Sequence, residues 1–188
     1  MRGRGLTLPE LLVGMALLGL LLTILMQLLT PSLHIWDVNR ARSDADQAAL
    51  VLLPRLTREL CATSRQSVTT ARGTVSFLST GSLEPGYDPR TGKPIWRLFV
   101  IYYLDEPGRE LYRREWPLAA PTSRPVRLTP GELAGLASDG RRASRGVSGF
   151  QMTDAAGEPL RLQVEFVRSS RSGLERTLRT VDLWPRYP

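Results

Sequence analysis

The feature that most constrains this chain is an uncharged apolar run close to its amino terminus. Residues Leu11 to Met26 contain no charged side chain and a single hydroxyl, that of Thr23, and the run continues through Gln27 to Leu29. A helix needs about 20 apolar residues to cross the hydrocarbon core of a bilayer. The run therefore predicts a membrane-spanning helix, with the remainder of the chain folding in water.

The charges on the two sides of the run differ. Arg2 and Arg4 precede it, whereas the first charged residue after Glu10 is Asp37. Positive charges beside a spanning helix stay in the cytoplasm, so we expect a single-pass inner-membrane protein with a cytoplasmic amino terminus and a periplasmic C-terminal domain. A secretory signal would end in small residues, but here Thr30-Pro31-Ser32 follows, so cleavage after the run is not expected.

Glu10 is unusual because it is a carboxylate at the start of an apolar helix. A charge near the centre of a bilayer costs roughly 3 kcal/mol on insertion scales. The sequence Thr7-Leu8-Pro9-Glu10 fits a capping box, in which Thr7 is the N-cap and Glu10 bonds back to the backbone, aided by the helix dipole. Pro9 is compatible with such a first turn. A local capping role is therefore one interpretation of Glu10.

The residues around Glu10 also resemble a known processing motif. The segment Arg4 to Leu11, RGLTLPEL, is similar to the prepilin cleavage and methylation motif of type IV pilins and type II secretion pseudopilins. In that family a membrane aspartyl peptidase cuts after the glycine and methylates the new amino terminus. The resemblance implies cleavage between Gly5 and Leu6, N-methylation of Leu6, and a role for Glu10 in subunit assembly.

In the family, the glutamate meets the amino terminus of a neighbouring subunit. Opposite charges brought together in lipid offset each other's desolvation, so this pairing is physically reasonable for Glu10 and compatible with capping. Two positions depart from the commoner pattern, because Leu6 replaces phenylalanine and Pro9 replaces an aliphatic residue. Glycine and glutamate remain in register.

After the apolar run, the pattern predicts an amphipathic second half of the same stem. Within residues 44–65, apolar side chains recur at spacings of three and four, at Ala45, Ala49, Leu52, Leu56 and Leu60. Two prolines interrupt the predicted helix. We expect Pro31 to kink or end it locally, and Pro54 to produce a kink or break near Leu50 to Pro54, because a proline inside a helix costs about 3 kcal/mol.

Beyond Thr74 the pattern changes to short alternating or β-branched runs, which predict mostly antiparallel strands over residues 74–79, 95–105, 110–115, 149–153, 160–167 and 174–183. Turn signals at Glu106–Arg109 and Ser169–Gly173 predict two hairpins. Residues 81–94 and 117–130 are rich in glycine and proline and are expected to be exposed loops.

Together these patterns predict an α+β fold that is pilin-like, with a long N-terminal helix packed on antiparallel β-sheets. The helix has a transmembrane half and an amphipathic half. The expected division is a leader peptide (1–5), a transmembrane helix (6–30), an amphipathic stem helix (31–66) and an extracytoplasmic β-rich globular domain (67–188).

The inventory of reactive side chains is poor. Cys61 is the only cysteine and His34 the only histidine, so the chain cannot form an internal disulfide or a Cys/His zinc site. Asp105-Glu106 and Asp44/Asp46 lack the alternating oxygen ligands of a calcium loop. We therefore expect a structural subunit that is not an enzyme and has no cofactor and no metal. Trp36 is expected at the membrane interface.

The net charge of +7 rests on 24 arginines and one lysine. The densest basic cluster, Arg141 to Arg145, together with Arg113 and Arg114, has two interpretations. It is either a solvated loop or a contact for DNA phosphates.

Two internal segments narrow the resemblance. Arg97 to Arg114, RLFVIYYLDEPGRELYRR, and Val147 to Thr153, VSGFQMT, resemble J-type minor pseudopilins of type II secretion and W-type minor pilins. This implies a minor subunit in the tip or initiation complex of a pilus or pseudopilus. The implied partners are other pilins or pseudopilins through the N-terminal helix, the prepilin peptidase, the inner-membrane assembly platform, and membrane lipid before assembly.

Two alternatives remain open. The arginine surplus favours a DNA-binding minor pilin of a transformation machine. The apolar run alone favours an uncleaved single-pass anchor with a scaffold domain.

Overall fold

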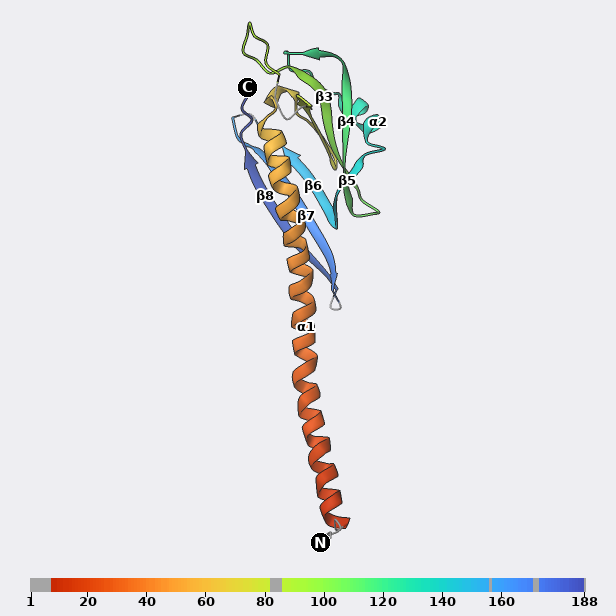
Figure 1. Cartoon of the computed structure of the whole chain (residues 1–188). Coiled ribbons are helices and arrows are strands. Elements are labelled where there is room, and N and C mark those ends of the chain that lie inside the picture. Colours follow the sequence, from red (N-terminus) through yellow and green to blue (C-terminus); the bar gives the residue numbers. More distant parts are fainter. Residues whose placement is uncertain (1–7, 82–85, 156, 171–172, 188) are drawn as a thin grey trace, which may run out of the picture.

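The computed structural model describes residues 8–81, 86–155, 157–170 and 173–187. A single helix of 54 residues, α1 (Leu8–Cys61), forms a long stem, and a β-rich head, which we define as residues 62–187, packs against one side of its C-terminal part (Figure 1). The head begins with a 3-10 helix at Arg65–Ser67. Its other elements are β1 (Thr69–Ala71), β2 (Thr74–Ser79), β3 (Trp96–Asp105), β4 (Glu110–Thr122), α2 (Pro130–Leu136), β5 (Arg141–Arg145), β6 (Val147–Thr153), β7 (Leu160–Ser170) and β8 (Gly173–Leu183).

The strands form two antiparallel sheets. The first has five strands in the order β1-β2-β3-β4-β5, and the second has three in the order β6-β7-β8. Helix α1 packs on the second sheet, against β7 and β8. The α+β class and the long helix on antiparallel sheets are as predicted, and the fold is pilin-like. Both predicted hairpins are present, since β3 pairs with β4 and β7 with β8.

Gly146 joins the two sheets, since it is the single residue between β5 and β6. Its φ of +67° lies in the left-handed region that favours glycine. Its carbonyl accepts a hydrogen bond from the backbone N–H of Val167 at 2.7 Å. A Cβ atom at this position would lie 2.7 Å from the Val167 carbonyl oxygen. A side chain here would force β6 and β7 apart.

The C-terminal half of α1 is amphipathic because its apolar residues recur on one face. Ala41, Ala45 and Ala49 are buried, and their small side chains allow the helix to approach the sheet closely. Further along, Leu52, Leu56 and Leu60 lie in the main core. That core also contains Val75, Phe77, Val100, Tyr102, Leu111, Val147, Phe150, Leu160, Leu162, Val164, Phe166 and Leu183.

The expected break near Pro54 was wrong, and so was an end at Pro31, because α1 runs through both prolines without interruption. Pro54 cannot donate to the carbonyl of Leu50, but both residues are exposed, so water can satisfy that carbonyl. Burial of Leu52 and Leu56 on the other face holds the two sides of Pro54 in one helix.

The predicted loop over residues 117–130 was also wrong at both ends. Strand β4 continues to Thr122, and α2 begins at Pro130 behind a capping box formed by Thr129 and Glu132. Beyond Arg113 strand β4 has no pairing with β5, so this part is an edge strand on which prolines are tolerated. The residues of 81–94 that the structure describes contain no helix and no multi-residue strand.

Candidate functional site

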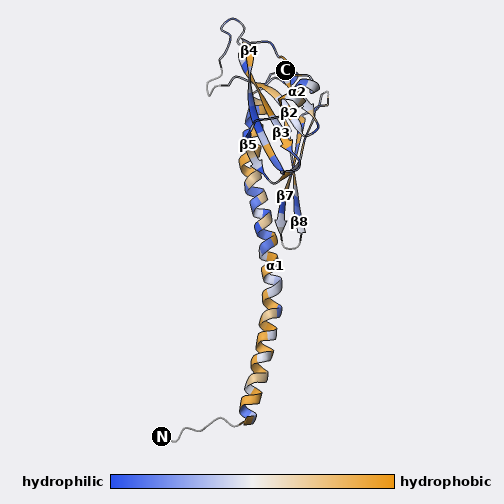
Figure 2. Cartoon of the chain, turned by 90° about the vertical axis from the view of Figure 1, so that its right-hand side faces the viewer, coloured by the Kyte–Doolittle hydropathy of each residue, from blue (hydrophilic) through white to orange (hydrophobic). Residues whose placement is uncertain are grey.

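The N-terminal half of α1, from Leu8 to Trp36, is not covered by the head, and we call it the bare half. The large apolar side chains from Leu8 to Trp36 that the structure describes are between 44% and 77% exposed. The most apolar window of α1 has a mean hydropathy of 2.4 with none of it buried, and the helix is long and apolar enough to cross a membrane. Figure 2 shows apolar residues on this half and none of the head beside it. A helix that is apolar on all sides needs lipid or other helices around it.

The hydroxyl groups in this half are compatible with lipid. The side chain of Thr23 donates to the Gly19 carbonyl at 2.8 Å, that of Thr30 to the Met26 carbonyl at 2.9 Å, and that of Ser32 to the Leu28 carbonyl at 2.9 Å. Each hydroxyl thus bonds within its own helix and leaves no donor pointing into a bilayer. These hydroxyl groups therefore do not oppose insertion of the helix into a bilayer.

The predicted processing residues lie at the amino-terminal end of α1 and directly before it. Glu10 is exposed in the first turn of α1. Gly5 and Leu6 lie outside the described residues, as does Thr7, the predicted N-cap. Cleavage after Gly5, methylation of Leu6 and the capping box at Thr7 therefore stay predictions.

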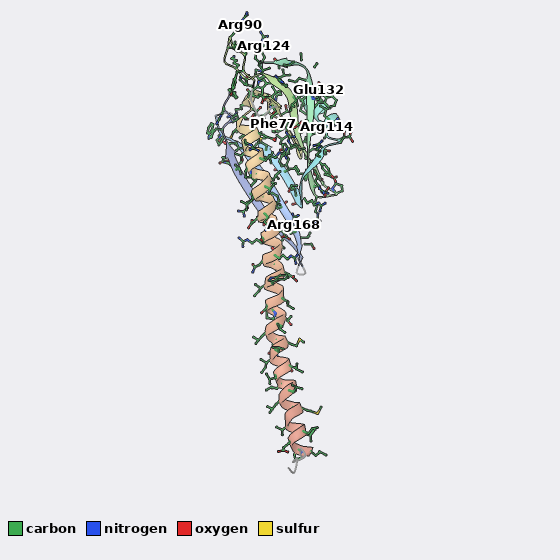
Figure 3. All side chains as sticks on the ribbon, in the orientation of Figure 1. Phe77, Arg90, Arg114, Arg124, Glu132 and Arg168 are labelled. Atoms are coloured by element: carbon green, nitrogen blue, oxygen red, sulfur yellow. The ribbon has the colours of Figure 1, made fainter. Side chains whose placement is uncertain are left out.

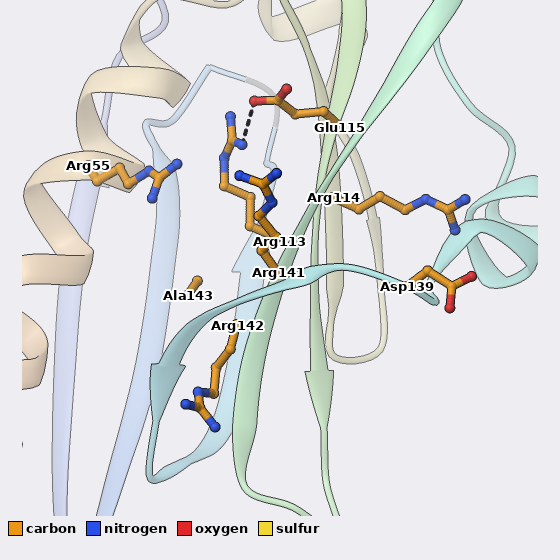
Figure 4. A pocket seen from close by; sticks show the side chains of 8 residues that line it. All are labelled: Arg55, Arg113, Arg114, Glu115, Asp139, Arg141, Arg142 and Ala143. Atoms are coloured by element: carbon orange, nitrogen blue, oxygen red, sulfur yellow. Dashed lines mark hydrogen bonds and ion pairs between the residues drawn. The ribbon is translucent and has the colours of Figure 1, made fainter.

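A second candidate site is an arginine-lined cavity of about 560 Å³ between α1, β4 and β5. Its lining residues are Arg55, Arg113, Arg114, Glu115, Asp139, Arg141, Arg142 and Ala143 (Figure 4). We call this the arginine cavity. The predicted loop at Arg141–Arg145 was wrong, because these residues form strand β5 at the edge of the first sheet. The pairing of β5 with β4 positions Arg141 opposite Arg113, which the sequence could not indicate.

Glu59 ties the stem helix to the wall of this cavity. Its carboxylate accepts hydrogen bonds from Arg55 at 3.2 Å, from Arg113 at 3.3 Å and from the Tyr102 hydroxyl at 3.0 Å. Burial, followed by the charge of Glu59, raises the pKa of Tyr102 well above its usual value, so the hydroxyl remains a donor at physiological pH. Glu59 therefore joins α1 to both β3 and β4.

The arginines of the cavity differ in how far they are neutralised. Burial alone would lower the pKa of Arg113, but its bonds with Glu115 and Glu59 outweigh burial and raise it. Arg142 pairs with Glu110 at 3.0 Å. Arg114 turns away to the Leu136 and Ser138 carbonyls. The side chain of Arg141 is exposed and forms no hydrogen bond or ion pair with any described residue, so its charge is available to an anion.

The described residues contain no group of three or more His, Cys, Asp or Glu side chains placed to hold a metal ion. Cys61, at the end of α1, is a free thiol that is partly buried against the main core. Of the tryptophans, Trp96 is buried, while Trp36, Trp116 and Trp184 are exposed.

Comparison with protein families matches the amino-terminal part of the chain. The family described as the prokaryotic N-terminal methylation motif matches residues 1–26. The match includes the predicted cleavage site, Glu10 and most of the apolar run. Comparison with curated proteins and comparison with solved structures give no match.

Proposed function

We propose that this type IV pilin-like protein is a structural subunit, a minor pilin or pseudopilin of the tip or initiation complex of a type IV pilus or type II secretion pseudopilus. In this proposal the chain is cleaved after Gly5, methylated at Leu6 and assembled through the apolar half of α1. The methylation motif indicates processing by a prepilin peptidase and assembly with other pilins in general. The motif and the apolar helix together indicate membrane anchoring.

One observation carries the proposal: a single continuous helix is buried in the head at one end and bare at the other. A helix used only as an anchor would be satisfied by lipid alone. Here the motif predicts that the amino terminus directly before the apolar half is processed. A rigid connection between that terminus and the head lets contacts between helices position the head.

Assembly of this kind exchanges one apolar environment for another. Lipid tails are as apolar as leucine, so the helix gains little hydrophobic free energy on leaving the bilayer for a bundle of related helices. The few polar groups in the segment then have a large influence on partner choice. The carboxylate of Glu10 is such a group, and in this proposal it pairs with the methylated amine of a neighbouring subunit.

The decisive experiment is mass spectrometry of the full chain after coexpression with a prepilin peptidase. An amino terminus at a methylated Leu6 supports the proposal, whereas an intact Met1 terminus supports an uncleaved anchor.

The assembly role of Glu10 is tested with Glu10→Gln, since this variant removes the charge and keeps the shape of the side chain. It is expected to be cleaved but to lose assembly with partner subunits, and normal assembly of Glu10→Gln would overturn the pairing role.

We propose DNA binding during transformation as a second candidate function, because arginines gather at one cavity of a basic head. Residues 62–188 contain nineteen Arg and Lys against thirteen Asp and Glu. The test is a gel shift of the full chain in non-ionic detergent over a range of salt concentrations. Binding that weakens with salt and is lost in Arg141→Ala, but kept in Arg90→Ala at the distal loop, supports this candidate. Absence of salt-sensitive binding contradicts it.

A further inference from the structure

The β7–β8 hairpin extends along α1 beyond the rest of the head, toward the bare half of the helix (Figure 1). The two strands are paired in register from Leu160–Leu183 down to Ser170–Gly173. An ion pair between Arg179 of β8 and Asp46 of α1 fixes the hairpin against the helix. Figure 3 labels Arg168 low on this hairpin, well below Phe77 in the core.

The end of the hairpin is level with the turn of α1 that carries Trp36. From Arg179 to Gly173 the strand covers six residues, or about 20 Å at the rise of a β-strand. The same distance along α1, from Asp46 toward the amino terminus, corresponds to about 13 residues and leads to Leu33. Any inclination between hairpin and helix shortens this distance, which brings the end of the hairpin closer to Trp36.

This level matches the surface of a bilayer that α1 would span. The apolar stretch from Leu11 to Leu29 is about 28 Å long as a helix, close to the ~30 Å hydrocarbon core of a bilayer. Leu33 and Trp36 lie a further ~6 and ~10 Å along the helix, which places Leu33 within the head-group layer and Trp36 at its outer edge. Trp36 is 59% exposed, and the guanidinium of Arg40 lies 5.5 Å from its ring centroid. Such a pair is typical of a membrane interface.

Apolar side chains are exposed on the hairpin at this depth. Leu174, four positions before Leu178 on β8, is 48% exposed, and Leu178 is 61% exposed. Both point to the face of the strand opposite Arg179. Apart from the Arg179–Asp46 pair, the sequence around the end of the hairpin and the facing part of α1 has a net charge of only +1: Arg40, Arg42, Arg168, Arg171 and Arg176 against Asp37, Asp44, Glu165 and Glu175. Contact with lipid here would depend on apolar surface more than on charge.

We propose that, before assembly, the end of the β7–β8 hairpin rests in the outer head-group layer of the bilayer, with Leu174 buried among the lipid head groups. The inference rests on the proposed function, because it requires α1 to span the membrane. It gives the head a second contact with the bilayer beside α1. A head attached only through a helix can turn about the helix axis, whereas two contacts fix which face meets a neighbouring subunit.

The test uses depth-dependent fluorescence quenching on the full chain in lipid vesicles. A Cys61→Ala background removes the native thiol, and Leu174→Cys, Leu178→Cys or Thr91→Cys then carries a fluorescent label. Thr91 is the matched control, because it is exposed on the loop before β3. With a quencher attached to lipid head groups, we expect at least about a twofold loss of fluorescence at position 174, less at 178 and none at 91.

Two vesicle compositions and a flotation assay separate the outcomes. Because the net charge around the hairpin end is small and Leu174 is apolar, quenching at 174 is expected in purely zwitterionic vesicles as well as in vesicles containing anionic lipid. Quenching that requires anionic lipid overturns the apolar contact. A chain that floats with vesicles but is quenched equally at 174 and 91 overturns the inference alone. A chain that does not float contradicts the membrane-spanning helix and therefore the proposed function itself.

Discussion

The two halves of α1 have the same backbone structure and opposite surroundings. From Ala41 to Leu60 one face of the helix is buried in the head, whereas from Leu8 to Trp36 every described large apolar side chain is exposed. In the C-terminal half the arrangement of apolar residues on one face is what directs packing on the head. In the N-terminal half the composition matters instead, since apolar residues lie on all sides of the helix. The difference teaches that one element can belong to a folded domain and to a future assembly at the same time.

The largest expected effect distinguishes the two faces of the packed half. Leu56→Ala removes a side chain that is 0% exposed, and it should lower the free energy of unfolding of the head by about 3 kcal/mol. Leu50→Ala changes the same residue type at a position that is 73% exposed and should change it by less than about 0.5 kcal/mol. Urea unfolding of the full chain in non-ionic detergent, followed by near-ultraviolet circular dichroism, measures both. Equal effects would mean that the outer face is also packed.

A charge in the bare half should affect membrane insertion and leave the stability of the head unchanged. Leu18→Arg is expected to reduce membrane insertion by about 3 kcal/mol, since the charge enters the hydrocarbon core, and to leave the unfolding of the head unchanged. Glycosylation-mapped insertion measures the first quantity and urea unfolding the second. The control is Leu50→Arg, outside the predicted span, which should insert normally. An altered head in Leu18→Arg would show that the two halves are coupled.

The close approach of α1 to the second sheet can be tested by adding volume. Ala45 is 2% exposed, so Ala45→Val should push the helix away from β7 and β8 and destabilise the head by about 2 kcal/mol. Ala16→Val makes the same change in the bare half, where the side chain is exposed, and should have no effect on the head. Urea midpoints compare the two. A neutral Ala45→Val would indicate unfilled space beneath the helix.

The smallest effect concerns the polar tie between stem and sheet. Glu59→Gln removes the charge that accepts hydrogen bonds from Arg55, Arg113 and Tyr102, and it should destabilise the head by about 1 kcal/mol, because Glu115 still pairs with Arg113. A double-mutant cycle with Tyr102→Phe measures the coupling between the charge of Glu59 and the Tyr102 hydroxyl. If the two changes add independently, the charge contributes nothing to this hydrogen bond.

Much of the fold could be predicted because the relevant signals are local. Alternation and β-branching located most of the strands, and Glu106–Arg109 marked a hairpin turn that the structure confirms. The predictions at two prolines were wrong, because exposure and strand position decide whether a proline is tolerated. Pro54 is accommodated because its face of α1 is exposed, and Pro117 lies in β4 because that part of the strand is an edge. Neither condition can be read from the residues beside the proline.

The candidate sites divide in the same way. The apolar run and Glu10 were identified from the sequence, because a membrane segment is defined by composition over consecutive residues. Only part of the lining of the arginine cavity could be identified from the sequence. Arg113, Arg141 and Arg142 stood out as clusters, but Arg55 lies on the stem helix and joins them only through tertiary packing. The level of the β7–β8 hairpin beside Trp36 likewise depends on the ion pair between Arg179 and Asp46.

By itself, the sequence determined that this chain has a bare apolar helix behind a methylation motif, followed by a β-rich head. These properties follow from short-range chemistry, in which neighbouring residues set hydropathy, capping and turns. Only the tertiary structure decided that one helix runs unbroken through two prolines, that Arg55 faces β5, and that a hairpin reaches the level of the predicted membrane surface. Those features depend on contacts between residues far apart in the chain, whose geometry local patterns do not encode.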